Sequence, residues 1–142
     1  MDRLEIEWSD VEDLVDILAE GIANNIDGIK FIHGLSRGGL IPAVMLSHKL
    51  NIPMTEVPHT YGSWQVLIVD DIADSGHTLR HWDMNGYQTA VLHYKPKTSK
   101  TIPTIWSTQH ETGEWIVYPW EQPQALTVQD YKLNGEYNDM EK

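Results

Sequence analysis

The run Val66-Leu67-Ile68-Val69 constrains the fold more than any other stretch of this 142-residue chain. Four consecutive apolar residues leave no polar face, so they predict a strand buried on both sides, as in a parallel sheet covered by helices. Asp70 and Asp71 follow at once, and a small-residue loop then leads to a helical segment. In open α/β sheets, ligands bind at this carboxyl end of the strands.

Strand-like and helix-like segments alternate around this run. The capping-box spacing of Ser9 and Glu12 predicts a helix from about residue 10 to 24, and Pro42 suits the first turn of a second helix. The expected elements are strands at 29–35, 53–57, 66–69 and 89–94, helices at 40–50 and 77–84, and loops at 36–39, 58–65 and 70–76. Residues 104–108 and 115–118 are expected to pair as short antiparallel strands. This order predicts an α/β fold with a mainly parallel, twisted sheet flanked by helices. We expect one domain over residues 1–123 and a polar tail over 124–142.

Charge and composition narrow the possible partners. The sequence has 10 Lys+Arg against 21 Asp+Glu, a formal net charge of -11. A field of that sign disfavours nucleic acid and anionic membranes as partners. The chain has no cysteine, and its acidic N-terminus lacks the apolar region of a signal peptide. We therefore expect a cytoplasmic protein that binds any phosphate locally.

The segment after the acidic pair is suited to such local binding. Backbone N–H groups of residues 74–78 can surround a phosphate at the start of the helix, and Gly76 allows close approach. Ser75 and Thr78 add hydroxyl donors, while the lack of a lysine excludes a Walker P-loop. A response-regulator receiver domain also has an acidic pair after a strand. That alternative is disfavoured, because 69 residues precede Asp70 and no later strand ends in Asp.

Four ordered motifs resemble those of the type I phosphoribosyltransferases, and the resemblance covers about residues 27–121. They are the strand, acidic pair and Asp-Ser-Gly-x-Thr run at 66–79, the Gly-rich loop at 34–42, Tyr94-Lys95-Pro96, and Trp115-Ile116-Val117-Tyr118-Pro119-Trp120-Glu121. The second motif is similar to the pyrophosphate loop of the xanthine-guanine branch. The resemblance implies the type I phosphoribosyltransferase fold with a small C-terminal hood that binds the base.

The resemblance implies a site for phosphoribosyl pyrophosphate (PRPP) with magnesium as cofactor. Its PRPP-binding residues would be Ser36, Arg37, Gly38, Gly39, Asp70, Asp71, Ala73, Asp74, Ser75, Gly76, His77 and Thr78. Asp71, Asp70 and Glu121 would contact Mg²⁺, for which carboxylate oxygens are suitable ligands, although Glu121 replaces the family's usual Asp. A non-proline cis peptide is expected at Leu35-Ser36 or Ser36-Arg37.

The resemblance also implies the reaction. Lys95, Trp115, Ile116 and Val117 would bind a 6-oxopurine (guanine, xanthine or hypoxanthine), and Asp74 would act as general base. The activity would be a glycosyltransferase of purine salvage that releases pyrophosphate. We also expect a homo-oligomer, either a dimer or a tetramer.

Several alternatives remain at this point. Only eight residues separate Val57 from Val66, where active family members carry a longer mobile lid, so a non-catalytic PRPP- or nucleotide-binding regulatory protein is the second hypothesis. His77 and His81 have helical metal-ligand spacing but lack a third ligand nearby, which disfavours zinc. His33 is expected to be a core histidine.

Overall fold

The computed structural model describes residues 2–121. The expected tail at 124–142 and the boundary at residue 123 lie outside the described residues. The helices and strands, in chain order, are β1 (Arg3–Glu5), α1 (Trp8–Asn25), β2 (Phe31–Gly34), α2 (Leu40–Leu50), β3 (Val66–Ala73), α3 (His77–Met84), β4 (Gln88–Tyr94), β5 (Ile105–Gln109) and β6 (Trp115–Val117).

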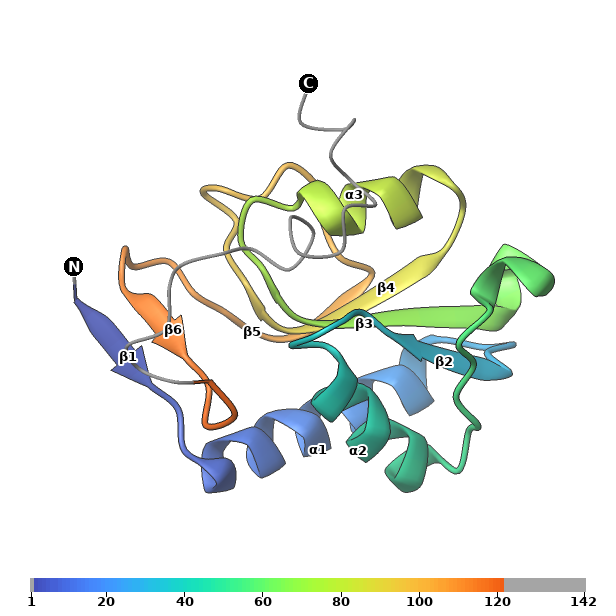
Figure 1. Ribbon diagram of the computed structural model, residues 1–142, viewed down its shortest axis with the longest axis horizontal. Helices are drawn as coiled ribbons and strands as arrows, with labels where there is room; N and C mark the ends of the chain where they lie inside the picture. The colour runs from blue at the N-terminus through green and yellow to red at the C-terminus, as the bar shows by residue number, and fades with distance from the viewer. Residues whose placement is uncertain (1, 122–142) are drawn as a thin grey trace.

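The main sheet has four parallel strands in the order β2-β3-β4-β5, and the α/β prediction is confirmed. Helices α1 and α2 cover one face, and α3 covers the other (Figure 1). Alternate residues of β3 serve the two faces: Leu67 and Val69 pack toward α1 and α2, whereas Val66 and Ile68 pack toward α3. This two-sided burial explains why the strand reads as an unbroken apolar run.

The predicted antiparallel pair at 104–108 and 115–118 is wrong. Strand β5 pairs in parallel with β4, and β6 pairs in parallel with β1 at the other end of the chain. β1 and β6 form a separate two-stranded sheet beside the end of the main sheet (Figure 1). β5 satisfies backbone groups at the open edge of β4, and β6 satisfies those of β1, which has no other strand partner among the described residues.

β3 is longer than expected, so the prediction of a loop from Asp70 to Gly76 is wrong over its first half. The strand continues through Ala73, and its partners on β4 extend to Tyr94. The polar residues at its end remain strand because β4 supplies backbone partners at this depth. The loop is therefore short and begins after Ala73.

Helix α1 starts earlier than the capping-box spacing of Ser9 predicted. Its N-cap is Glu7, whose backbone N–H donates to Asp10 Oδ2 at 2.9 Å in a reciprocal capping box. The pairing of β1 with β6 explains the early start: the Ile6 N–H still donates to the Val117 carbonyl of β6 at 2.8 Å, and the chain enters the helix as soon as it leaves β1. The predicted bounds of α2 and α3 are confirmed.

The expected strand at 53–57 is only an isolated parallel bridge between Met54 and Ile32. The next segment consists of two 3-10 turns, Pro58–Thr60 and Ser63–Gln65. Within residues 2–121, the helices are all too short or too polar to cross a membrane.

Candidate functional site

The glycine loop at 36–39 and the acidic end of β3, which the resemblance assigns to one PRPP site, lie against each other. A Cβ on Gly38 would collide with the Asp71 carboxylate, and one on Gly39 would lie 2.9 Å from the Asp70 Cα and 2.8 Å from the Leu35 carbonyl oxygen. Both loops follow neighbouring parallel strands, β2 and β3, so their ends meet at one edge of the sheet. The Ser36–Arg37 peptide bond is cis, one of the two positions expected.

The loop that follows β3 is held by the chain between β4 and β5. The Ala73 carbonyl accepts from the Lys95 N–H at 3.0 Å, and the Ser75 carbonyl accepts from the Lys100 N–H at 2.8 Å. Gly76 has φ of 80° and forms the N-cap of α3, and a Cβ there would lie 2.8 Å from the Lys100 nitrogen. Two constraints, a left-handed backbone and close packing, therefore require glycine. His77 and Thr78 occupy the first turn of α3, the end of a helix that attracts anions.

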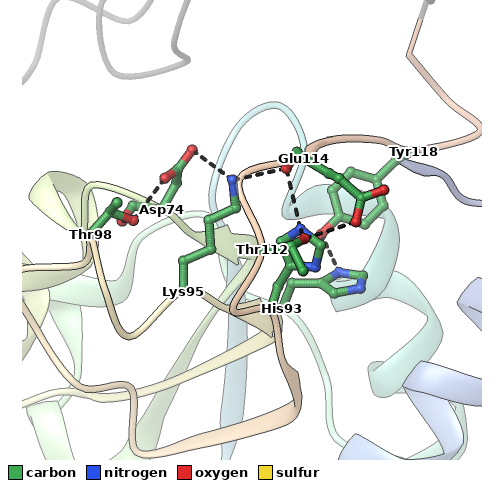
Figure 2. A network of polar contacts seen from close by, with 8 residues as sticks. Asp74, His93, Lys95, Thr98, Thr112, Glu114 and Tyr118 are labelled. Atoms are coloured by element: carbon green, nitrogen blue, oxygen red, sulfur yellow. Dashed lines mark hydrogen bonds and ion pairs between the residues drawn. The ribbon is translucent and has the colours of Figure 1, made fainter. Parts of the chain in front are cut away.

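Lys95 and Asp74 are brought together at the mouth of this loop (Figure 2). The Lys95 Nζ lies 3.6 Å from Asp74 Oδ2 and donates to the Glu114 carbonyl at 3.4 Å. The Thr98 hydroxyl donates to the Asp74 backbone carbonyl at 2.8 Å and reaches Asp74 Oδ1 at 3.1 Å. The side chain of Lys95 is only 10% exposed and that of Asp74 is 34% exposed. The buried ammonium thus links the loop that begins at Asp74 to Glu114, the residue before β6.

Trp115 and the backbone of β6 form the other side of the candidate site. The Lys95 Nζ lies 6.0 Å from the centroid of the Trp115 ring. Trp115 and Val117 use their backbone groups toward β1, since Trp115 N–H donates to the Asp2 carbonyl and the Val117 carbonyl accepts from Ile6. Ile116 therefore directs its N–H and carbonyl toward the opposite edge of β6, where no strand of the described chain pairs.

Two buried residues near the acidic end of β3, Tyr118 and His93, were not predicted as site residues from the sequence. The Tyr118 hydroxyl donates to the Asp71 carbonyl at 3.0 Å and lies 2.7 Å from His93 Nδ1. Burial raises the pKa of Tyr118 well above its usual value, as do the carboxylates of Asp71 and other acidic residues around the site. Burial lowers the pKa of His93 to about 4, with smaller contributions from His110 and Lys95. Tyr118 lies inside the recognised tryptophan motif, but no spacing in the sequence signals contact with residues 25 and 47 positions away.

The three carboxylates expected around magnesium do not form a ready-made metal cluster. Among residues 2–121, no group of three or more His, Asp or Glu side chains is arranged to hold a metal ion. Glu121 Oε1 accepts from the Tyr118 N–H at 3.0 Å, so this oxygen caps the turn after β6. The part of the chain that the structure describes also places no such group around His77 and His81. His33 lies in β2 and is half-buried, and its Nδ1 donates to the Thr55 carbonyl at 2.8 Å.

The short segment at 58–65 lies at the opposite end of the sheet from Asp70 and Asp71. It precedes β3, and its Tyr61 ring stacks on Phe31 at the start of β2, with centroids 4.0 Å apart. His59 stacks on Trp82 of α3 at 5.2 Å. Figure 1 shows these turns at the far right, away from β6. This segment does not cover the candidate site.

Comparison with known proteins gives the same family as the motifs. No family model matches the chain. The xanthine-guanine phosphoribosyltransferase of Nitratidesulfovibrio vulgaris strain Hildenborough is 27% identical over 120 residues, which are 70% of this chain and 73% of that protein. The enzyme of the same name from Cereibacter sphaeroides is 28% identical over 112 residues, 62% of this chain and 66% of that protein.

A solved structure is similar over nearly the whole chain. The purine phosphoribosyltransferase from Pyrococcus horikoshii Ot3 is 30% identical, with a TM-score of 0.70, and the match covers 90% of this chain and 100% of that chain. The fold, the ordered motifs and these relatives agree. The chain belongs to the type I phosphoribosyltransferase family.

Proposed function

We propose that this protein transfers the phosphoribosyl group of PRPP to a 6-oxopurine and releases pyrophosphate. The position of Lys95 carries this proposal. Its buried ammonium lies between Asp74, at the start of the proposed phosphate-binding residues 74–78, and the Glu114 carbonyl, and it lies beside Trp115. A base bound there would contact Lys95 while its ribose partner lies at the end of β3. The names of the relatives support a purine as the acceptor.

Hydrogen-bond donors and acceptors at the site favour a 6-oxopurine as the base. A lysine ammonium can only donate, so Lys95 suits the 6-oxo group of guanine, xanthine or hypoxanthine and opposes the 6-amino group of adenine. Trp115 offers a ring face for stacking. The outward N–H and carbonyl of Ile116 can pair with the far edge of the base, while Val117 holds β6 to β1.

Three neighbouring segments would bind PRPP. Backbone N–H groups of residues 74–78 would hold the 5′-phosphate at the start of α3, and Ala73 ends the strand that presents them. The carboxylates of Asp70 and Asp71 would accept from the ribose hydroxyls. The backbone at 36–39 and the Arg37 guanidinium would bind the pyrophosphate, since an Arg fork matches phosphate oxygens.

Magnesium fits this donor set as a partner of PRPP. Asp70 and Asp71 supply hard oxygen ligands, and Mg²⁺ is usually bound through one or two carboxylates together with substrate phosphates. The absence of a three-ligand cluster in the described chain is compatible with that mode. When bound, the ion would neutralise negative charge on the pyrophosphate. Glu121, whose Oε1 accepts from the Tyr118 N–H, would add a further carboxylate to this set.

Asp74 would act as the general base of the transfer. The bond from C1 of the ribose to the pyrophosphate oxygen breaks, a bond from C1 to the purine nitrogen forms, and Asp74 accepts the proton that leaves the purine. The transition state resembles the oxocarbenium ion of glycoside chemistry. Thr98 and Lys95 hold one Asp74 oxygen each, which fixes the carboxylate beside the base.

The second candidate function is that of a PRPP- or nucleotide-binding regulatory protein without turnover. The position of segment 58–65 favours it, because this segment packs on Phe31 and Trp82 and leaves the candidate site without a lid from this part of the chain. The homo-oligomeric state and the cytoplasmic location expected from the sequence stay predictions.

One assay separates the two candidates. The protein is incubated with PRPP and Mg²⁺ and with guanine, xanthine, hypoxanthine, adenine or orotate in turn, and the nucleotide and pyrophosphate formed are measured. The proposal expects equal amounts of nucleotide and pyrophosphate with a 6-oxopurine and little product with adenine or orotate. Tight PRPP binding by calorimetry without release of pyrophosphate would favour the regulatory protein. Equal turnover of adenine and guanine would contradict the role of Lys95.

A further inference from the structure

A buried chain of hydrogen bonds joins the residue after β6 to the acidic end of β3. It runs from His93 in β4 to the Tyr118 hydroxyl, 2.7 Å away, and from there to the Asp71 carbonyl at 3.0 Å. Figure 2 shows the His93 and Tyr118 side chains close together beside the Lys95 network. His93 is 4% exposed and Tyr118 is 2% exposed, so solvent does not compete for these bonds.

The chemistry of the three groups fixes the direction of every bond. A backbone carbonyl can only accept, so the Tyr118 hydroxyl must donate its single proton to Asp71. The Tyr118 oxygen must then accept from His93, which places the imidazole proton on Nδ1 and leaves Nε2 without one. Burial lowers the pKa of His93 to about 4, so its imidazole is neutral near pH 7 and carries only this one ring proton.

The ring of Tyr118 has its own support, independent of the hydroxyl. It stacks on Trp120, with centroids 4.7 Å apart and planes 2° apart, and it belongs to the core that packs under α1. A phenylalanine at this position would keep that packing. The hydroxyl is therefore the group of Tyr118 that holds the Asp71 carbonyl. The backbone N–H of Tyr118 separately donates to Glu121 Oε1.

We propose that Tyr118 is a positioning residue for the acidic pair and that His93 sets the direction of its hydroxyl. The inference rests on the proposed function, in which Asp70 and Asp71 bind the ribose of PRPP. Tyr118 directly follows β6, so its bond to Asp71 joins the end of the strand that binds the purine to the strand end that binds the ribose.

The first test is Tyr118→Phe, with Tyr87→Phe as the matched control. Tyr87 is also buried, but its hydroxyl lies 3.5 Å from His59 on the α3 face, away from the acidic pair. We expect Tyr118→Phe to raise the KM for PRPP by about five- to tenfold, the effect of one buried hydrogen bond. The KM for guanine should stay within about twofold of the parent value. Tyr87→Phe should leave both constants unchanged.

The second test asks whether His93 acts through its Nδ1 proton. Asn retains a side-chain N–H donor and Leu has none, so His93→Asn should keep the PRPP KM near the parent value and His93→Leu should raise it as much as Tyr118→Phe does. The double variant Tyr118→Phe/His93→Leu should show no further increase, because both changes remove the same link. Nitrogen-15 shifts of the His93 ring should show a protonated Nδ1 and an unprotonated Nε2 at pH 7.

The results that would overturn the inference are distinct from those that would overturn the function. A parent that binds no PRPP and releases no pyrophosphate contradicts the proposed function and, with it, the inference. An active parent whose PRPP KM is unchanged in Tyr118→Phe contradicts the inference alone. So does an equal rise in the KM values of PRPP and guanine, or a His93 ring protonated on Nε2 instead of Nδ1. If the parent binds PRPP without turnover, the same shifts are expected in its dissociation constant by calorimetry.

Discussion

Replacement of Lys95 by methionine removes one charge and leaves the aliphatic part of the side chain in place. In the parent protein the ammonium lies 3.6 Å from Asp74 Oδ2 and 3.4 Å from the Glu114 carbonyl oxygen. The Glu114 carbonyl accepts from one of its three N–H donors and Asp74 forms an ion pair with it, so the ammonium retains a donor for a ligand. Lys95→Met therefore tests whether that donor recognises the 6-oxo group.

The effect on stability should be small. At an effective dielectric constant of about 20, charges at the Lys95–Asp74 separation attract each other by about 4 to 5 kcal/mol. Most of that is offset by the desolvation of the buried ammonium and by solvent screening of Asp74, whose side chain is 34% exposed. We expect a net loss of about 1 kcal/mol in the free energy of unfolding.

The effect on turnover should be larger. A hydrogen bond from a charged donor contributes about 1.5 to 3 kcal/mol, and its loss lowers kcat/KM for guanine by about 10- to 150-fold. The PRPP dissociation constant should stay within about twofold, since the backbone groups at 74–78 are unchanged. The adenine rate, already limited by opposed donors, should fall less than the guanine rate.

Initial rates with guanine and adenine, PRPP calorimetry and denaturant unfolding of Lys95→Met measure these three effects. Lys97→Met is the matched control, because Lys97 is exposed and two residues away. A decrease in kcat/KM for guanine of less than about threefold, or an equal decrease with adenine, would refute the role given to Lys95. A loss of PRPP affinity as large as the loss of turnover would show that the substitution disturbs the phosphate loop.

Three further predictions concern neighbouring residues. Asp74→Asn should reduce the initial rate with guanine by about 10²- to 10⁴-fold with little change in PRPP affinity by calorimetry, and an unchanged rate would remove Asp74 as the general base. The pKa of His93 is lowered from 6.5 to about 4, so between these pH values the unfolded state binds a proton that the folded state does not. The free energy of unfolding should therefore have its full value above pH 6.5 and fall by about 3 kcal/mol as the pH drops to 4. Denaturant unfolding at several pH values measures this slope, which should be shallower in His93→Asn, and equal slopes would contradict the assignment. Gly39→Ala should lower the free energy of unfolding by about 1 to 3 kcal/mol, because its Cβ would lie 2.8 Å from the Leu35 carbonyl oxygen. Gly113→Ala is the control and should be neutral, since a Cβ there has nothing within 4 Å. Equal effects of the two substitutions in denaturant unfolding would show that the loop at 36–39 relaxes freely.

The sequence determined the elements whose bonding is local. Helix α2 begins and ends where its apolar pattern and Pro42 predicted, and α3 begins after Gly76 as expected, because each helical N–H pairs with a carbonyl four residues earlier. The unbroken apolar run of β3 also predicted its burial on both faces. The four ordered motifs were sufficient to recognise the family and to name the loops that converge at one edge of the sheet.

The tertiary structure decided which strands pair and in which direction. β5 finds its partner in β4, and β6 finds its partner in β1 more than 100 residues earlier, so neither pairing follows from the composition of the strands themselves. The bond from Tyr118 to Asp71 has the same character. A strand or a buried hydroxyl can be satisfied by any suitably placed acceptor, and only the packed fold determines which one is within reach.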